Sequence, residues 1–158
     1  MTELLRLSQS LEQHEAKRAF VYDDATGKPI GPGSVVKGYP TIGIGRNLLS
    51  KGLADDEIRY LLGNDMRDAL KQAETFPWFM GLDSVRQNVV VELIFNLGLV
   101  RFRTFKKFID AMATARFYVA AAELADSKWQ QQVDPILGDG KGRADVLINM
   151  MRTGEWPT

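Results

Sequence analysis

Glycine and proline are concentrated in one short stretch of the chain, and this constrains the fold more than any other feature. The turn formers are Gly27, Pro29, Gly31, Pro32, Gly33, Gly38 and Pro40. Such a density is incompatible with a helix, because proline lacks an amide donor and glycine favours turns. Short apolar pieces between turn formers suit strands instead. The stretch from Phe20 to Leu49 is therefore predicted to form a small β lobe.

Helical spacing marks the sequence on both sides of this stretch. Leu4, Leu7 and Leu11 recur at intervals of three and four, which predicts a short amphipathic helix near the N-terminus. From Leu53 onward the same spacing returns, and the acidic run 55–57 lies where the positive end of a helix dipole would be. We expect this second, long helix to join the β lobe to a larger helical lobe.

The remainder of the chain is predicted to be helical. Asp83 has the sequence position of an N-cap. The apolar face of the helix that follows comprises Val85, Val89, Leu93 and Leu97. Shorter helices are expected over residues 105–113, 117–126 and 143–151.

These patterns predict an α+β fold that is mainly α, in a single domain over residues 1–158. The β lobe should cover about 17–52, and the helical lobe about 76–158 plus the N-terminal helix. A chain of 158 residues is long enough to bury its own core. With no cysteine and one histidine, neither a disulfide nor a metal site is expected, and no cofactor is implied.

Two carboxylates, Glu15 and Asp24, are candidates for acid and base chemistry. Glu15 follows the stripe of Leu4, Leu7 and Leu11, so it would end a buried helix face, where a carboxyl is more easily kept protonated as a general acid. Asp24 lies in a polar turn segment, where a carboxylate stays solvated. Glycosidic bond cleavage uses such a pair. The plainer alternatives are a helix-end charge for Glu15 and an ordinary turn aspartate for Asp24.

Several blocks of the sequence resemble the phage-type lysozymes in the same order. The blocks are HEAKR at 14–18, VYDDATG at 21–27, YPTIGIG at 39–45, DSVR at 83–86, FNLG at 95–98, AAELADSKW at 121–129, GRA at 142–144 and RTGEW at 152–156. The resemblance runs from about Leu4 to Trp156 and is to the T-even phage lysozyme-like endolysins of the muramidase family. It implies a lysozyme-like fold, with a small β lobe and a larger helical lobe joined by a long helix.

The resemblance also implies an activity. A protein of this family is a glycoside hydrolase that cleaves the β-1,4 bond between N-acetylmuramic acid and N-acetylglucosamine, with an inverting mechanism, in the lysis of bacteria by a phage. Glu15 would match the family's acid, Asp24 its second carboxylate, and Thr41 the hydroxyl that helps to hold the attacking water. The saccharide contacts implied by the resemblance fall on Leu48, Phe95, Phe108 and Glu123.

The chain departs from the family pattern in three places. Sixteen residues separate Asp24 from Thr41, where relatives have five, which indicates an insertion within Lys28–Gly38. Arg46 stands where the family has histidine, and an ion pair with Asp65 on the long helix is predicted. Phe108 and Glu123 replace small or neutral polar residues, and Phe108 also has the spacing of a core aromatic.

Two alternative functions stay open at this stage. A lytic transglycosylase would cut the same bond without a second carboxylate, and a non-catalytic lysozyme-like module would only bind the wall. Segment 101–108 combines basic and aromatic residues, a pattern that is also found in nucleic-acid-binding proteins. A formal net charge of zero and helical spacing favour an ordinary amphipathic helix there, so no nucleic acid is expected.

The expected partner is bacterial peptidoglycan, and a monomer without stable membrane insertion is predicted. The first residues lack the apolar core of a secretory signal. The protein is therefore expected in the host cytoplasm until a separate membrane-permeabilising phage protein releases it to the wall, unless a virion carries it.

Overall fold

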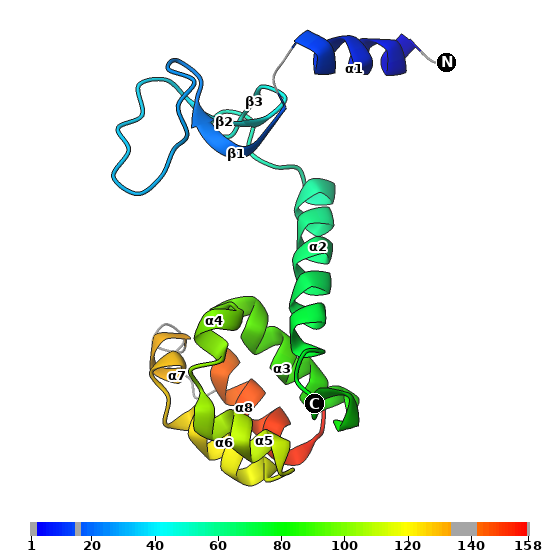
Figure 1. Cartoon of the computed structure of the whole chain (residues 1–158), viewed down its shortest axis with the longest axis vertical. Helices are drawn as coiled ribbons and strands as arrows, with labels where there is room; N and C mark the ends of the chain where they lie inside the picture. Colours follow the sequence, from blue (N-terminus) through cyan, green and yellow to red (C-terminus); the bar gives the residue numbers. More distant parts are fainter. Residues whose placement is uncertain (1–2, 15–16, 134–141, 158) are drawn as a thin grey trace. The chain divides into compact units, whose positions relative to one another are not determined.

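The computed structural model describes residues 3–14, 17–133 and 142–157. They form two compact units, residues 1–59 and 60–158, and each is described by itself (Figure 1). The fold is mostly helical with one small antiparallel sheet, which confirms the predicted α+β class.

The first unit is built on a three-stranded sheet in the order β1-β2-β3. The strands are β1 (Arg18–Asp23), β2 (Pro40–Gly43) and β3 (Arg46–Asn47). A tight turn joins β2 to β3, with Gly43 and Gly45 at φ of 67° and 70°, a conformation that glycine adopts without steric cost. β1 and β2 pair so that Tyr22 lies opposite Thr41 and Asp23 opposite Pro40. A small sheet is thus present where turn formers and short apolar pieces predicted strands, and Asp24 and Thr41 lie at one end of the β1–β2 pair.

The insertion predicted within Lys28–Gly38 is a loop between β1 and β2 (Figure 1). Its first residues return to β1, since the Asp23 amide donates to Lys28 O at 2.9 Å and the Ile30 amide donates to Val21 O at 3.0 Å. Residues 31–37 are exposed. The chain therefore extends outward after Ile30 and must be brought back to the sheet at Gly38.

The N-terminal helix α1 (Glu3–His14) forms as predicted, and its apolar face is exposed within the first unit. Leu4, Leu7 and Leu11 are 78%, 54% and 47% exposed. Within the first unit, the described apolar side chains leave this face exposed, so burial of the stripe stays a prediction. The amphipathic spacing accounts for the helix itself.

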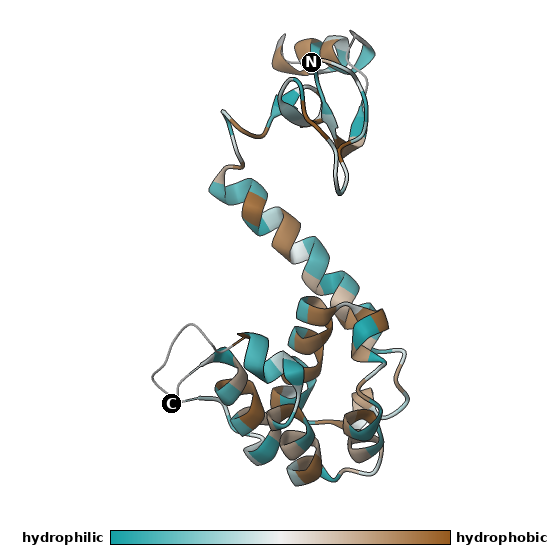
Figure 2. Ribbon diagram, turned by 90° about the vertical axis from the view of Figure 1, so that its left-hand side faces the viewer, coloured by the Kyte–Doolittle hydropathy of each residue, from teal (hydrophilic) through white to brown (hydrophobic). Residues whose placement is uncertain are grey.

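Helix α2 (Asp55–Ala73) begins at the predicted acidic turn. Figure 2 shows hydrophobic and hydrophilic residues alternating along it, and its larger apolar residues are partly exposed. Before that turn, the Ala54 amide donates to Glu57 Oε2 at 2.7 Å. Acidic side chains at a helix N-terminus satisfy free amides and complement the dipole.

Arg46 on β3 contacts the first turn of α2. Its Nη2 lies 2.7 Å from Glu57 Oε2, its Nη1 donates to Glu57 Oε1 at 2.7 Å, and its Nε donates to Gly52 O at 2.7 Å. The predicted partner, Asp65, is wrong: the partner is Glu57, eight residues earlier on the same helix. Both oxygens of Glu57 face the guanidinium, which is the favourable two-point geometry for arginine and a carboxylate.

The second unit is a bundle of helices around α3 (Ser84–Leu97). The other elements are η1 (Phe79–Gly81), α4 (Leu99–Phe102), α5 (Lys106–Ala113), α6 (Phe117–Ala125), α7 (Lys128–Val133) and α8 (Arg143–Thr153). Asp83 is the N-cap of α3, as predicted, and accepts from the Arg86 amide at 2.9 Å. The helices expected over 105–113, 117–126 and 143–151 are confirmed, whereas η1, α4 and α7 were not predicted.

The core of this unit is apolar and contains contacts between aromatic rings. Val85, Val89 and Leu93 are buried on α3, as their spacing predicted. Phe102 contacts Phe76 and Phe108 edge to face, at ring-centroid distances of 5.4 and 5.9 Å. The buried Trp129 donates its Nε1 to Oδ1 of the exposed Asn96 at 2.9 Å. Within the described ranges, no helix has the length and hydropathy needed to cross a bilayer.

Candidate active site

The main chain of Tyr39 links the predicted second carboxylate to the predicted hydroxyl. The Tyr39 amide donates to Asp24 Oδ1 at 2.7 Å. The Tyr39 carbonyl accepts from Thr41 Oγ1 at 3.1 Å and from the Asp24 amide at 3.2 Å. Sixteen residues separate Asp24 from Thr41 in sequence, and the antiparallel pairing of β1 with β2 places them around the main chain of one residue, Tyr39.

Asp24 and Thr41 differ in their exposure to solvent. Asp24 is exposed, whereas Thr41 is only 3% exposed. Within the described residues, Asp24 Oδ2 carries no hydrogen bond, so this oxygen is available to a water molecule. Because the Thr41 hydroxyl donates to Tyr39 O, its lone pairs remain to accept a further hydrogen. Each of the two side chains therefore keeps an acceptor that none of the described residues fills.

Asp23, which precedes Asp24, is buried with only 4% of its surface exposed. Its Oδ1 accepts from the amides of Ala25 at 3.1 Å and Gly38 at 2.8 Å. Its Oδ2 accepts from Thr26 Oγ1 at 3.0 Å and from the Lys37 amide at 3.0 Å. The carboxylate thus binds both ends of the segment between β1 and β2.

These donors hold Asp23 in its charged form. The hydrogen bond from the Lys37 amide is the largest influence that lowers the pKa of Asp23 below its ordinary value of 3.8. Bonds from Gly38, Thr26 and Ala25 act in the same direction, and together they outweigh the loss of hydration, which raises the pKa. Asp23 therefore stays ionised where an ordinary aspartate would begin to take up a proton.

Gly38 lies against Asp24 so closely that a side chain would not fit. A Cβ placed on Gly38 would lie 2.1 Å from Asp24 Oδ1 and 2.7 Å from Ala25 Cβ. The requirement for glycine here arises from close approach, because Gly38 is not among the residues with positive φ. The return of the insertion to the sheet is therefore packed directly against the candidate carboxylate.

Glu15, predicted as the general acid, lies outside the described residues. Its role stays a prediction. The structure begins again at residue 17, just before β1, and the other two predicted catalytic residues, Asp24 and Thr41, are brought together by Tyr39.

Two of the predicted saccharide contacts lie in different units. Leu48 follows β3 in the first unit, is half-buried, and donates its amide to Pro40 O at 2.8 Å. Phe95 lies on α3 in the second unit, is 42% exposed, and borders a pocket of about 200 Å³ with Leu62 and Met66. Both side chains reach the surface of their own unit, and their binding role stays a prediction.

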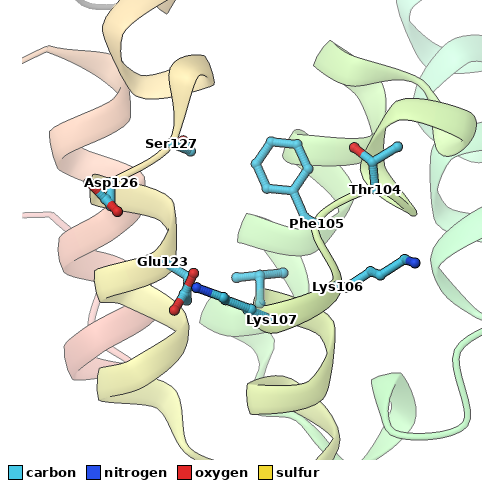
Figure 3. Close-up of a pocket in the computed structure, with 8 residues that line it drawn as sticks. Thr104, Phe105, Lys106, Lys107, Glu123, Asp126 and Ser127 are labelled. Atoms are coloured by element: carbon cyan, nitrogen blue, oxygen red, sulfur yellow. The ribbon is translucent and has the colours of Figure 1, made fainter.

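Phe108 and Glu123, the other two predicted contacts, border one pocket of about 360 Å³ between α5 and α6. Phe108 is 1% exposed and packs on Phe102, so its ring is part of the core and forms only the floor of this pocket. Figure 3 shows Lys107 extending toward Glu123, whereas Lys106 points away. A packing role thus accounts for Phe108, and a saccharide contact by either residue stays a prediction.

The site has no visible arrangement for a metal. The described part of the chain contains no group of three or more histidine, cysteine, aspartate or glutamate side chains placed to hold one. The chemistry available around Asp24 is that of a carboxylate and a hydroxyl with main-chain amides.

Two features of this site were not found from the sequence. The tandem Asp23-Asp24 was visible, but only Asp24 was assigned a role. The main chain of Tyr39 has no side-chain signal at all. Both depend on a contact between β1 and the residues that precede β2, which only the three-dimensional pairing supplies.

Comparison with known proteins supports a lysozyme-like relationship. The chain is 24% identical over 106 residues to a Dictyostelium discoideum protein named probable T4-type lysozyme 1. The matched segment covers 65% of this chain and 58% of that protein, so the chain spans a little over half the length of its relative. No model of a known protein family matches the chain. The mostly helical structure with its three-stranded sheet agrees with this relationship.

Proposed function

We propose that this protein is a peptidoglycan hydrolase that cleaves the β-1,4 bond between N-acetylmuramic acid and N-acetylglucosamine. The observation that carries the proposal is the bridge made by Tyr39, whose amide binds Asp24 and whose carbonyl binds Thr41. A carboxylate and a hydroxyl held by the main chain of one residue are suited to orient a single water molecule.

Asp24 and Thr41 act on the attacking water in this mechanism. The water donates one hydrogen to Asp24 Oδ2 and the other to the Thr41 hydroxyl, whose own hydrogen is engaged by Tyr39 O. Its oxygen lone pair is then directed at the anomeric carbon. As the bond forms, Asp24 accepts the proton as a general base.

Glu15 is the general acid of the proposed reaction. It protonates the glycosidic oxygen as the bond to the anomeric carbon breaks, so the leaving sugar departs as an alcohol. Attack by water on the face opposite the leaving group inverts the configuration at that carbon. This assignment rests on the resemblance and on the position of Glu15 nine residues before Asp24.

The lysozyme-like relationship supports the same reaction class. The relative carries the name of a lysozyme, and the present chain retains glutamate, aspartate and threonine at the positions that the resemblance assigns to catalysis. We extend the proposal to a monomeric phage endolysin that lyses bacteria after a separate phage protein has permeabilised the membrane.

The test is digestion of purified peptidoglycan by the protein and by Glu15→Gln and Asp24→Asn, with the products identified by mass spectrometry. The wild type should release reducing muramic acid ends. Glu15→Gln should lose about 10²- to 10⁴-fold in turnover, the usual contribution of positioned acid catalysis, and Asp24→Asn a comparable factor. Glu74→Gln and Asp83→Asn are matched controls that should keep activity, because both lie outside the site.

The products also separate the alternatives. Anhydro-muramic ends would identify a lytic transglycosylase, and intact peptidoglycan that sediments with the protein would identify a wall-binding module. Full turnover by a correctly folded Glu15→Gln variant would refute the acid assignment. Circular dichroism of each variant establishes that loss of activity is not loss of folding.

A further inference from the structure

The insertion between Asp24 and Thr41 creates a difficulty for any chemistry that needs these two residues at fixed positions relative to each other. Ordering a long loop costs conformational entropy, and residues 31–37 of this loop are exposed. The loop nevertheless ends at Gly38, which is packed against Asp24, and at Tyr39, which bonds to both Asp24 and Thr41. Something must fix the point at which the loop returns.

The Asp23 carboxylate occupies that point. It accepts hydrogen bonds from the amides of Lys37 and Gly38 on the returning chain, and from the Ala25 amide and the Thr26 hydroxyl on the departing chain. Two carboxylate oxygens thus receive four donors across a separation of up to fifteen residues. Hydrogen bonds to a charged acceptor are stronger than neutral ones. Here they hold both ends of the insertion at one carboxylate.

We propose that Asp23 is a positioning residue for the hydrolytic site, holding the main chain at 37–38 so that the Tyr39 peptide stays between Asp24 and Thr41. This inference rests on the proposed function for its consequence in catalysis. Asp23 itself touches neither water nor substrate in this scheme, because it is buried and all four of its contacts are internal. It acts on the reaction only through Tyr39.

The adjacent aspartates therefore have separate tasks. Asp23 is the last residue of β1 and its carboxylate is buried, whereas Asp24 is the first residue of the turn that follows and is exposed. The inward carboxylate organises the insertion, and the outward carboxylate is available to the reaction. A chain without the insertion would not need these hydrogen bonds.

The decisive variant is Asp23→Asn, which keeps the size of the side chain. An amide offers one acceptor oxygen, and its NH₂ group faces donors at the other position. At least one of the Lys37 and Gly38 amides then loses its acceptor. Gly38→Ala is a second variant that disturbs the same contact from the other side, since its Cβ would fall 2.1 Å from Asp24 Oδ1. Asp83→Asn is the matched control in the other unit.

Two measurements test the inference. Amide hydrogen exchange followed by NMR should show faster exchange at Lys37, Gly38 and Tyr39 in Asp23→Asn, with the amides of α3 unchanged. On soluble peptidoglycan fragments, kcat should fall about 10²-fold, as expected for misplaced reacting groups. KM should change by less than about threefold, because substrate contacts are left in place.

The outcomes separate this inference from the proposed function. An inactive wild type would overturn the proposed function, and the exchange of Tyr39 would still decide whether Asp23 positions it. An active wild type with unchanged kcat in Asp23→Asn would overturn the positioning role. A rise in KM alone, or unaltered exchange at Tyr39, would overturn it equally. Reduced kcat together with faster exchange at Tyr39 supports it.

Discussion

At the scale of single residues, two neighbouring aspartates show how burial determines the role that a side chain can have. Asp23 and Asp24 have the same side chain, but one is 4% exposed and the other is exposed to solvent. Asp23 is the last residue of β1, whereas Asp24 is the first residue of the turn that follows. The sequence alone supported Asp24 as a candidate base, and it gave no reason to distinguish Asp23 from a second turn aspartate.

The ionisation of Asp23 makes a prediction about stability and pH. Its folded-state pKa lies below the ordinary value of 3.8, so its contribution to stability is present above that value and is lost as pH falls through the folded-state pKa. The difference in unfolding free energy between wild type and Asp23→Asn should therefore be constant from neutral pH to about pH 5 and shrink below pH 3.8.

Urea unfolding at a series of pH values measures this difference. The three tryptophans all lie in residues 60–158, so far-UV circular dichroism and the amide signals of Lys37 and Gly38 are the suitable probes of the first unit. A difference that stayed constant down to pH 2 would contradict the prediction.

At the scale of secondary structure, helix α3 was the best predicted element. Its cap, its start and its buried face all follow from local spacing. Asp83 accepts the Arg86 amide at 2.9 Å and pairs with the Arg86 guanidinium at 2.5 Å. Arg86 in turn donates to Met151 O at 2.9 Å, so the cap of α3 is linked to the end of α8.

Loss of this cap should destabilise the second unit. Asp83→Ala removes the acceptor for a free helix amide, which costs about 1 to 2 kcal/mol of unfolding free energy. Asp83→Asn should lose much less, because asparagine is also a good N-cap. Tryptophan fluorescence during urea unfolding reports this unit. Equal stabilities for Asp83→Ala and wild type would show that the cap contributes nothing.

For the basic aromatic segment 101–108, the role of each side chain can be assigned only once its packing is known. Its spacing favoured an amphipathic helix over a nucleic-acid surface. Phe102 and Phe108 are buried in the core, whereas Lys106 and Lys107 are exposed. The buried aromatic side chains therefore support the fold, and the basic side chains of the segment are exposed to solvent.

At the scale of the whole molecule, the charge balance limits how the protein can approach its proposed substrate. Twenty basic and twenty acidic residues give a formal net charge of zero. Long-range attraction to an anionic wall should be weak, so binding must depend on short-range contacts in the site. The proposed hydrolase is therefore expected to be tolerant of salt.

Binding to cell-wall sacculi at different ionic strengths tests this expectation. Cosedimentation of the inactive Glu15→Gln variant should change by less than about threefold between about 50 and 200 mM NaCl, because only net attraction is screened. Adding Glu74→Lys and Glu155→Lys to that variant replaces two exposed negative charges by positive ones, which raises the net charge by about four and should give stronger, salt-sensitive binding. A tenfold loss of binding without those two changes would contradict the expectation.

The sequence by itself determined the kind of each main element and the class of the fold. Turn formers excluded a helix between Gly27 and Pro40, and apolar spacing with capping residues defined α1, α2 and α3. These are local effects, set by residues within a few positions of one another. The motif positions of Asp24 and Thr41 were likewise visible from the sequence.

Only the tertiary structure decided which groups meet. The bonds of Asp23 to Lys37 and Gly38, the bridge through Tyr39, and the choice of Glu57 by Arg46 join residues that are distant in sequence. The exposed leucines of α1 show the same limit, since amphipathic spacing states that a face is apolar and not what covers it. The periodicity of apolar residues predicts one helix or strand at a time, whereas the contacts between residues distant in sequence depend on the tertiary fold.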